Sequence, residues 1–340
     1  MSLSRITNII LSITLAGFLL IYLRTFLIPL VFAMAIWFVI RKLRNILNSV
    51  IRMPFWLSSS LASLIILIVL YGFIQLLTFQ VSAFLRPDNL QKYNDNFQKI
   101  GQTIVDMVGD QALQNGLSQL QDIEFTSYIQ DMLAVLTNIL GNSFMVLLYL
   151  LFLILEEGIF KLKLAGMFKD KEKRKEAYST IEQIVKSVES YISLKTVVSI
   201  ITGVASYLGL LIIGIDFALF WALLIFILNY IPTVGSLIGT VFPAIMALIQ
   251  YQDFGVFFTV LVVIGIIQLI VGNFLEPKVM GDNLNISPLV VILSLTLWGL
   301  LWGVTGMILS VPIMVVLIII LSKIPATKNI ALMMSSDGNV

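Results

Sequence analysis

The sequence contains no cysteine and no histidine, and only 12% of its 340 residues are charged. Without cysteine the chain has no thiol nucleophile and no disulfide, and without histidine it has no imidazole base and no Cys/His zinc site. The net charge of +2 gives no electrostatic reason to expect a nucleic-acid partner. Several common kinds of catalytic and metal site are therefore excluded.

Apolar residues take the place of the missing charge. Hydrophobic residues make up 59% of the chain, and the mean hydropathy is +1.01. Soluble domains usually contain about 45–50% apolar and about 25% charged residues. The composition therefore predicts an all-α integral membrane protein whose main contact is a lipid bilayer. The N-terminal apolar run has no A-x-A-like cleavage site, so we expect a retained first span.

A helix needs about 20 apolar residues to cross a bilayer, and several apolar segments of this chain are shorter. Proline and glycine clusters separate the short ones, as in broken or re-entrant helices. The sequence predicts about eight crossings. The expected apolar segments are Ile6–Leu23, Phe26–Ile40, Trp56–Val81, Met132–Leu155, Thr196–Ile213, Phe217–Leu228, Leu237–Ile249, Phe254–Gly272, Leu289–Trp302 and Met307–Leu321.

Composition shifts divide the chain into five expected parts. They are an N-terminal set of three spans (1–81), a polar helical subdomain outside the bilayer (82–131), a fourth span with a basic amphipathic helix (132–190), a C-terminal transport core (191–323) and a tail (324–340). The basic run 161–175 precedes an apolar stripe over 181–192, which predicts a membrane-skimming helix. The tail is expected to be polar and disordered.

The distribution of positive charge predicts the orientation in the membrane. Arg41–Phe55 reads as a loop with four cations and no acid, and the run 161–175 is also basic. Cytoplasmic loops are enriched in Lys and Arg. We therefore expect both segments, and both termini, on the cytoplasmic side. The more acidic subdomain 82–131 is expected on the outside.

Two short motifs, Asn229–Gly235 and Asn273–Gly281, gather the polar residues of the C-terminal core. A polar side chain at membrane depth is costly and usually faces a cavity or a partner. Proline removes a backbone donor and discourages helix before it, which frees carbonyls at mid-bilayer to bind a solute. The motifs are either a weak internal repeat or two independent breaks. The expected substrate or ion pathway consists of Asn229, Pro232, Gly235, Asn273, Glu276, Pro277, Gly281 and Asp282.

Glu276 is the main candidate for ion coupling. A carboxyl group in a dry environment has a raised pKa and can carry a proton. Alternatively, Glu276 pairs with Lys278 or lies at the interface. For Lys278 and Asp282 we favour interfacial positions, and for Lys195 we expect a side chain that extends toward the membrane surface.

Small residues are expected to allow close helix packing, through Gly235-x-x-x-Gly239 and Gly299-x-x-x-Gly303. The expected packing residues are Gly239, Gly299, Gly303 and Gly306. An intramembrane carboxylate pair of Asp216 and Asp282 is the enzymatic alternative, but the usual Gly-x-Gly-Asp sequence is missing. There is also no Walker A motif. We expect no catalytic residue, no metal and no cofactor.

The segments Asn229–Gly239 (NYIPTVGSLIG) and Glu276–Pro312 carry a family resemblance. They contain Ile231-Pro232-x-x-Gly235, Pro277-x-x-Met280-Gly281, Pro288, and Gly303-x-x-Gly306-Met307 leading to Pro312. These motifs, and the order of spans, polar insertion, basic helix and broken core, resemble the autoinducer-2 exporter (AI-2E) family, or PerM-like permeases. The resemblance covers nearly the whole chain.

The resemblance implies a multi-pass protein of the bacterial or archaeal cytoplasmic membrane that forms homo-oligomers, with a pentamer as one form. It implies export of a small polar solute, with the quorum-sensing signal autoinducer-2 as the leading candidate. Our leading hypothesis is a secondary exporter that works by alternating access between the C-terminal core and an N-terminal scaffold, with proton or sodium coupling through Glu276, alone or with Asp282. Efflux of a monovalent cation by sodium(lithium)/proton antiport is the alternative. A scaffold or pore that recruits a partner through the outer subdomain is a third reading.

Overall fold

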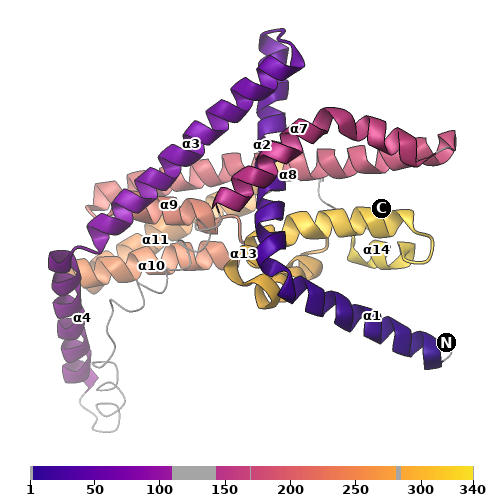
Figure 1. The fold of residues 1–340 in the computed structure, drawn as a ribbon. Helices are drawn as coiled ribbons and strands as arrows, with labels where there is room; N and C mark the ends of the chain where they lie inside the picture. Colours follow the sequence, from indigo (N-terminus) through magenta and orange to yellow (C-terminus); the bar gives the residue numbers. More distant parts are fainter. Residues whose placement is uncertain (1–2, 109–142, 169, 281–284, 340) are drawn as a thin grey trace. The chain divides into compact units, whose positions relative to one another are not determined.

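The computed structural model describes residues 3–108, 143–168, 170–280 and 285–339. The described residues are almost entirely helical and contain no strand (Figure 1). Seven of their helices are long and apolar enough to cross a membrane. An eighth apolar helix, α9 (Ala218–Leu228), has only 11 residues. The predicted all-α membrane fold is confirmed, whereas the count of eight crossings stays a prediction.

The contacts between residues divide the chain into two units, each assembled from separate stretches of sequence. Unit 1 comprises Met1–Ile66, Gly141–Leu194 and Met280–Val340, and unit 2 comprises Leu67–Leu140 and Lys195–Val279. Two long helices, α3 (Phe55–Phe84) and α8 (Lys171–Ile213), each contribute one part to each unit.

Unit 1 contains most of the N-terminal and C-terminal helices. Its helices, besides parts of α3 and α8, are α1 (Leu3–Tyr22), α2 (Arg24–Val50), α7 (Ser143–Met167), α13 (Pro288–Lys323) and α14 (Lys328–Met334). A core around Ala33, Ile40, Ala62 and Leu150 joins α2, α3 and α7.

The apolar stripe on α8 has a different environment from the one predicted. Val188, Tyr191 and Ile192 are buried against Phe38 of α2 and Val311 of α13. The stripe therefore packs in the protein core of unit 1, and the prediction of a membrane-skimming helix is wrong for this part of α8. The same apolar pattern is found on helix faces that pack against protein and on those that contact lipid, so the sequence could not distinguish the two environments.

The segment Arg41–Phe55 is mostly helix, because α2 continues to Val50. Arg41 and Arg44 lie on this helix and form ion pairs with acids on α7 and α8. Two of the four cations that supported the cytoplasmic loop assignment are thus compensated within the protein. The loop itself shrinks to residues 51–54.

The sequence predicted a disordered C-terminal tail, but the structure shows these residues ordered. The backbone N–H of Ser287 donates to the carbonyl of Met334 at the end of α14. The Asn285 carboxamide accepts hydrogen bonds from Ser336 and from the N–H of Asp337, and donates to the Asn339 carbonyl. These bonds fasten residues 334–339 to the segment that precedes α13. The same contacts explain Asn285 as a structural anchor.

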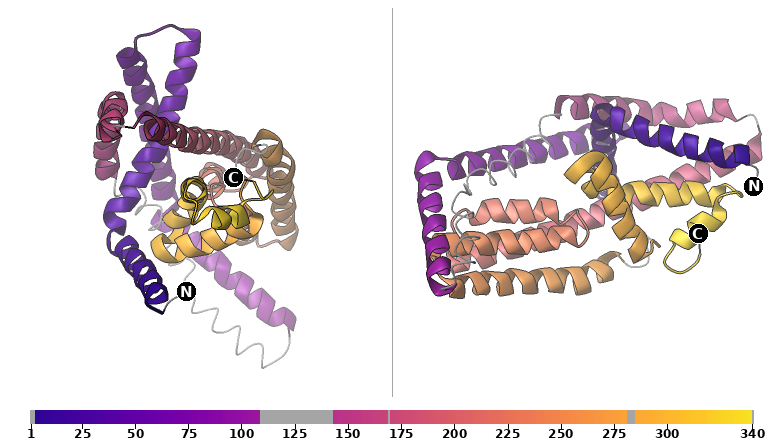
Figure 2. Two further views of the ribbon diagram at one scale, coloured as in Figure 1. Left: turned by 90° about the vertical axis from the view of Figure 1, so that its right-hand side faces the viewer. Right: turned by 90° about the horizontal axis from the view of Figure 1, so that it is seen from below.

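Unit 2 contains a bundle of helices with one helix across its end. The bundle comprises the second part of α8, then α9, α10 (Val234–Tyr251), α11 (Phe254–Ile270), the π-helical turn η1 (Val271–Leu275) and α12 (Glu276–Met280). Figure 2 shows α9, α10 and α11 side by side, with α4 (Pro87–Val108) across one end. Large apolar side chains cover much of the bundle's outward surface, as in Ile212 and Leu269, which are 85% and 60% exposed.

The contacts along the bundle fix which residues lie at the same level. α8 and α11 run antiparallel, because Lys195 contacts Glu276 at one end while Gly209 faces Val263 farther along. α9 and α10 form an antiparallel hairpin, in which Gly239 faces Ile225. The only charged residues of the segment 195–279 lie at its two ends: Lys195, Glu276 and Lys278 at one, Asp216 and Asp253 at the other.

Candidate functional site

A buried ion pair closes one end of the unit 2 bundle. The Lys195 ammonium donates to the Glu276 carboxylate at 2.5 Å, and the two side chains are 4% and 25% exposed. The prediction that the Lys195 side chain extends toward a membrane surface is therefore wrong. Glu276 pairs with Lys195 instead of with Lys278, its predicted alternative partner. The pair joins the first residue of the 195–279 segment to a residue near its last. It holds α8 and α12 together at this end.

The same face of α8 holds the first Pro-Gly motif. The Asn229 carboxamide donates to the Ser199 hydroxyl at 3.0 Å, and both residues are buried. The hydroxyls of Thr196 and Tyr230 lie 2.7 Å apart. Positions 195, 196 and 199 lie within about one helical turn. One turn of α8 therefore contacts Glu276 of the second motif and two residues of the first.

The first motif is the tip of the α9–α10 hairpin, formed by residues 229–233. Pro232 cannot donate a backbone hydrogen bond, and Thr233 has a positive φ of 60°. A Cβ at position 235 would overlap the carbonyl oxygen of Leu228, so only glycine allows the two helices to approach this closely. The predicted break is present. It lies near the Lys195 end of the bundle rather than at mid-depth, since Asn229 is level with Ser199, about 6 Å along α8 from Lys195.

The second motif is not a break. The chain stays helical from α11 through η1 into α12, and the Glu276 N–H donates to the Val271 carbonyl in the wider π pattern. Pro277 follows directly, and its ring would clash with a carbonyl one α-turn earlier in a regular helix. The π-turn accommodates this proline and leaves Asn273 exposed. The two motifs thus have different structures, so a structural repeat is contradicted.

The remaining predicted site residues divide into three groups. Gly281 and Asp282 lie outside the described residues. Gly239 faces Ile225 and the Gln268 amide, Gly299 faces Met307, and a Cβ at Gly306 would overlap the Trp298 carbonyl. Gly303 has open space around it instead of a packed neighbour, together with φ 64° and ψ −148°.

Gly303 is a turn residue, because its backbone conformation is one that L side chains rarely adopt. The residues on its two sides run antiparallel. Ser294 donates to the Ser310 carbonyl at 3.2 Å, and Gly306 packs against Trp298. α13 therefore folds back on itself, and the packing role predicted for Gly303 is wrong. The Gly299-x-x-x-Gly303 spacing resembled a packing motif and hid the turn.

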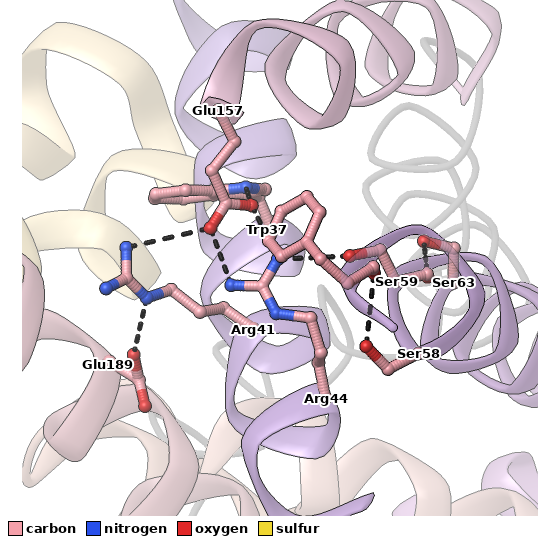
Figure 3. Close-up of polar contacts among 9 residues, drawn as sticks. Trp37, Arg41, Arg44, Ser58, Ser59, Ser63, Glu157 and Glu189 are labelled. Carbon is pink, nitrogen blue, oxygen red and sulfur yellow. Dashed lines mark hydrogen bonds and ion pairs between the residues drawn. The ribbon is translucent and has the colours of Figure 1, made fainter. Parts of the chain in front are cut away.

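Unit 1 contains a second buried ionic cluster, which sequence reasoning missed (Figure 3). Both terminal nitrogens of Arg44 bind the Glu157 carboxylate, at 2.6 and 2.8 Å. The Trp37 indole donates to the same carboxylate at 3.1 Å, and Arg44 also donates to the Ser59 hydroxyl. Arg41 lies 3.5 Å from Glu189 of α8. A bidentate arginine–carboxylate pair fixes geometry as well as charge, so this cluster holds α2, α3, α7 and α8 in register.

A polar network lies at the opposite end of unit 2 from Lys195. The Tyr93 phenol of α4 donates to Asp216 at 2.8 Å, and Lys92 pairs with the same carboxylate. The Asn96 amide donates to the Ile249 carbonyl at the end of α10 and its oxygen accepts from Gln252. Burial, together with the Asp216 carboxylate, raises the pKa of Tyr93 well above its usual value. These bonds make α4 part of unit 2.

The described residues contain no group of three Asp or Glu side chains that could hold a metal ion. The predicted absence of a cofactor stays a prediction. The apolar helices, the α9–α10 hairpin and the reversal within α13 together define a multi-pass helical membrane protein with ionic contacts inside its helical units. Ionisable side chains within helical membrane proteins commonly mark substrate or ion pathways.

Comparison with known proteins identifies the family. A model of the AI-2E family of transporters matches residues 9–326. The AI-2 transport protein TqsA of Escherichia coli is 37% identical over 211 residues, which are 61% of this chain and 59% of TqsA. A relative from Borreliella burgdorferi is 34% identical over 65% of this chain and 62% of its own length, and one from Haemophilus influenzae is 30% identical over 82% of both chains. The chain belongs to the AI-2E family of transporters.

The matches with TqsA and the Borreliella protein span about three fifths of those relatives. The names of the Borreliella and Haemophilus proteins describe transport without a substrate. The family of this chain is therefore shown, and its activity and solute are taken up as a proposal below.

Proposed function

We propose that this protein exports a small polar solute from the cytoplasm and couples export to a proton or a monovalent cation through the Lys195–Glu276 pair. The observation that carries the proposal is the burial of this pair beside the α9–α10 hairpin tip. A buried charge is costly once its partner is removed. Any proton or cation that binds Glu276 must therefore compete with Lys195, which gives the bundle two states with different charge arrangements.

The hairpin tip supplies the link from charge to solute. Asn229 and Tyr230 contact the same turn of α8 that carries Lys195. Release of Lys195 from Glu276 alters the turn on which the tip rests. Alternating access then follows from opening and closing of this end of the bundle. Autoinducer-2 is the leading solute, because TqsA is named for its transport.

The experiment is gradient-driven flux in vesicles that contain the purified full-length protein. Glu276→Gln is expected to abolish the dependence of autoinducer-2 flux on an imposed pH or sodium gradient. Asp88→Asn is the matched control, because Asp88 is an exposed carboxylate on α4. The double variant Lys195→Met with Glu276→Gln separates coupling from folding, since it leaves no unpaired buried charge. Gradient-dependent flux in the double variant at the wild-type rate would contradict the coupling role.

Sodium(lithium)/proton antiport is the second candidate function. It is favoured by the chemistry of the pair alone, because exchange of a proton and a small cation on Glu276 needs no organic solute. Addition of sodium or lithium to vesicles with an imposed pH gradient distinguishes the two. Rapid collapse of the gradient without added solute selects antiport. A scaffold or pore remains the third reading, in which partner recruitment survives the loss of coupled flux.

The proposed setting is the cytoplasmic membrane of a bacterium or archaeon, with both termini inside and the protein as a homo-oligomer. The basic residues of the first turns of α8 support this orientation, since Lys171, Lys173, Arg174 and Lys175 follow one another closely. Accessibility of single cysteines, introduced into a chain that has none of its own, tests the orientation directly.

A further inference from the structure

Three buried polar groups in the unit 2 bundle have no hydrogen-bond partner among the residues that the structure describes. They are the Gln268 amide nitrogen on α11, the Ser206 hydroxyl on α8 and the Trp221 indole nitrogen on α9. Their residues are 8%, 0% and 1% exposed. A buried donor without a partner is strongly unfavourable, and nearly all such groups in native proteins are satisfied. Three in one bundle call for an explanation.

The three groups lie within about one helical turn of one another along the bundle. The contacts of Lys195 with Glu276 and of Gly209 with Val263 place Gln268 level with the stretch of α8 between Thr202 and Ser206. The hairpin register places Trp221 one turn from Ile225, which faces Gly239. Gly239 in turn faces the Gln268 amide nitrogen, and a Cβ there would lie 3.4 Å from it.

That level is the middle of the apolar span. Ser206 is 11 residues after Lys195 and ten before Asp216, the charged residues that mark the two ends of the bundle. At a rise of 1.5 Å per residue the two ends are about 30 Å apart, the thickness of a hydrocarbon core. Ser206 therefore lies about 15 Å from either charged end, and Gln268, eight residues before Glu276, lies about 12 Å from that end. Trp221, five residues after Asp216, lies nearer the other end.

The chemistry of this level selects a class of ligand. Between the two ends, residues 196–215, 217–252 and 254–275 contain no charged side chain. An ion would lack a counter-charge there, and the cost of a bare charge in such surroundings is high. An amide N–H and an indole N–H are donors, and a hydroxyl both donates and accepts. The fitting ligand is uncharged and carries oxygen acceptors, as hydroxyl or carbonyl groups do.

We infer that Gln268, Ser206 and Trp221 form the mid-membrane binding position for an uncharged solute rich in hydroxyl or carbonyl oxygens. This inference rests on the proposed transport function and adds the position and chemical class of the solute. It also assigns separate places to solute and ion. The solute binds at the uncharged centre, and the coupling ion binds two helical turns away at Glu276.

Binding and flux are measured separately, so that the two proposals can fail separately. Binding is followed by intrinsic tryptophan fluorescence of the full-length protein in detergent, with autoinducer-2, ribose and erythritol as uncharged probes and gluconate and choline as charged ones. Wild-type protein is expected to bind at least one uncharged probe saturably and neither charged probe. Gln268→Leu and Ser206→Ala are each expected to weaken that binding about three- to tenfold, the effect of one lost neutral hydrogen bond.

Thr202→Val is the matched control. Thr202 is a buried hydroxyl on the same face of α8, but it already donates to the Val198 carbonyl of its own helix at 2.8 Å. Its replacement is expected to leave the dissociation constant unchanged. A chain in which Gln268→Leu fails to fold leaves Ser206→Ala to decide.

The outcomes separate as follows. Absence of binding by all uncharged probes, equal binding of charged probes, or unchanged binding in both variants overturns the inference, and the last result assigns the three donors to structural water. Binding with the expected losses but no vesicle flux supports the inference and refutes transport of that solute. Gradient-driven flux with an unchanged half-saturation concentration in Gln268→Leu and Ser206→Ala supports transport and overturns the inference.

Discussion

The Lys195–Glu276 pair makes a quantitative prediction about stability. Lys195→Met and Glu276→Gln are compared singly and together. In Glu276→Gln, an ammonium group that is only 4% exposed loses its carboxylate. Removal of one member of a buried pair costs about 3–5 kcal/mol, because the other charge is left uncompensated. In Lys195→Met, the remaining carboxylate is 25% exposed, and water screens part of the loss. We expect about 1–2 kcal/mol for that variant.

The double variant is expected to be more stable than Glu276→Gln alone, since it leaves no buried charge. The coupling energy between the two positions is then about 2 kcal/mol or more. The assay is equilibrium unfolding in mixed micelles with an increasing fraction of SDS, followed by tryptophan fluorescence. If the losses of stability in the two single variants sum to the loss in the double variant within about 0.5 kcal/mol, the two side chains act independently, and the ion pair is refuted. A Lys195→Met variant less stable than Glu276→Gln would refute the assigned difference in burial.

Three further predictions use the same unfolding assay. Gly235→Ala should destabilise the protein by more than about 3 kcal/mol, because its Cβ would overlap a backbone carbonyl. Gly272→Ala is the control and should change stability by less than about 1 kcal/mol, since a Cβ there has nothing within 4 Å. Similar losses in both variants would contradict the close approach of the two hairpin helices. Arg44→Met should cost up to about 3–5 kcal/mol, because the Glu157 carboxylate loses its bidentate partner and keeps only the Trp37 N–H and the more distant Arg41. The exposed Arg52→Met should have a small effect; equal effects would exclude the cluster as a structural tie. The raised pKa of Tyr93 means that the folded protein keeps a proton that the unfolded chain releases above about pH 10. Stability should fall as pH rises past that value, by up to about 1.4 kcal/mol per pH unit, and Tyr93→Phe should remove this part of the slope; identical slopes would disprove it.

Much of the helical architecture could be predicted from the sequence, because long apolar runs have few alternatives in a membrane. The tip at Pro232 was also predictable, since proline and glycine act locally on the backbone. The turn at Gly303 was not, because the same glycine spacing serves helix packing and a reversal. Pro277 indicated a break, but one π-turn accommodates its ring without ending the helix.

The ion pairs were beyond local reasoning for a different reason. Lys195 and Glu276 are 81 positions apart, and Arg44 and Glu157 are 113 apart. No local pattern specifies such partners. The sequence did hold one signal, which is the small number of cations in this segment. Lys195 and Lys278 are the only cations within residues 195–279, so a buried carboxylate there had only two candidate partners. The expectation that Lys195 extends to the surface came from considering each side chain alone.

The unequal arms of the α9–α10 hairpin have a consequence for the rest of unit 2. From the shared tip, α9 extends 11 residues and α10 extends 18, so α10 projects about 10 Å past the start of its neighbour. The difference forms a ledge, and α4 rests on it through Asn96 and the Ile249 carbonyl. A shortened protein without α4 would expose the blunt end of α9 and the last carbonyls of α10 to lipid headgroups. Minimal versions of this protein should therefore retain α4 even where the polar segment that follows it is trimmed.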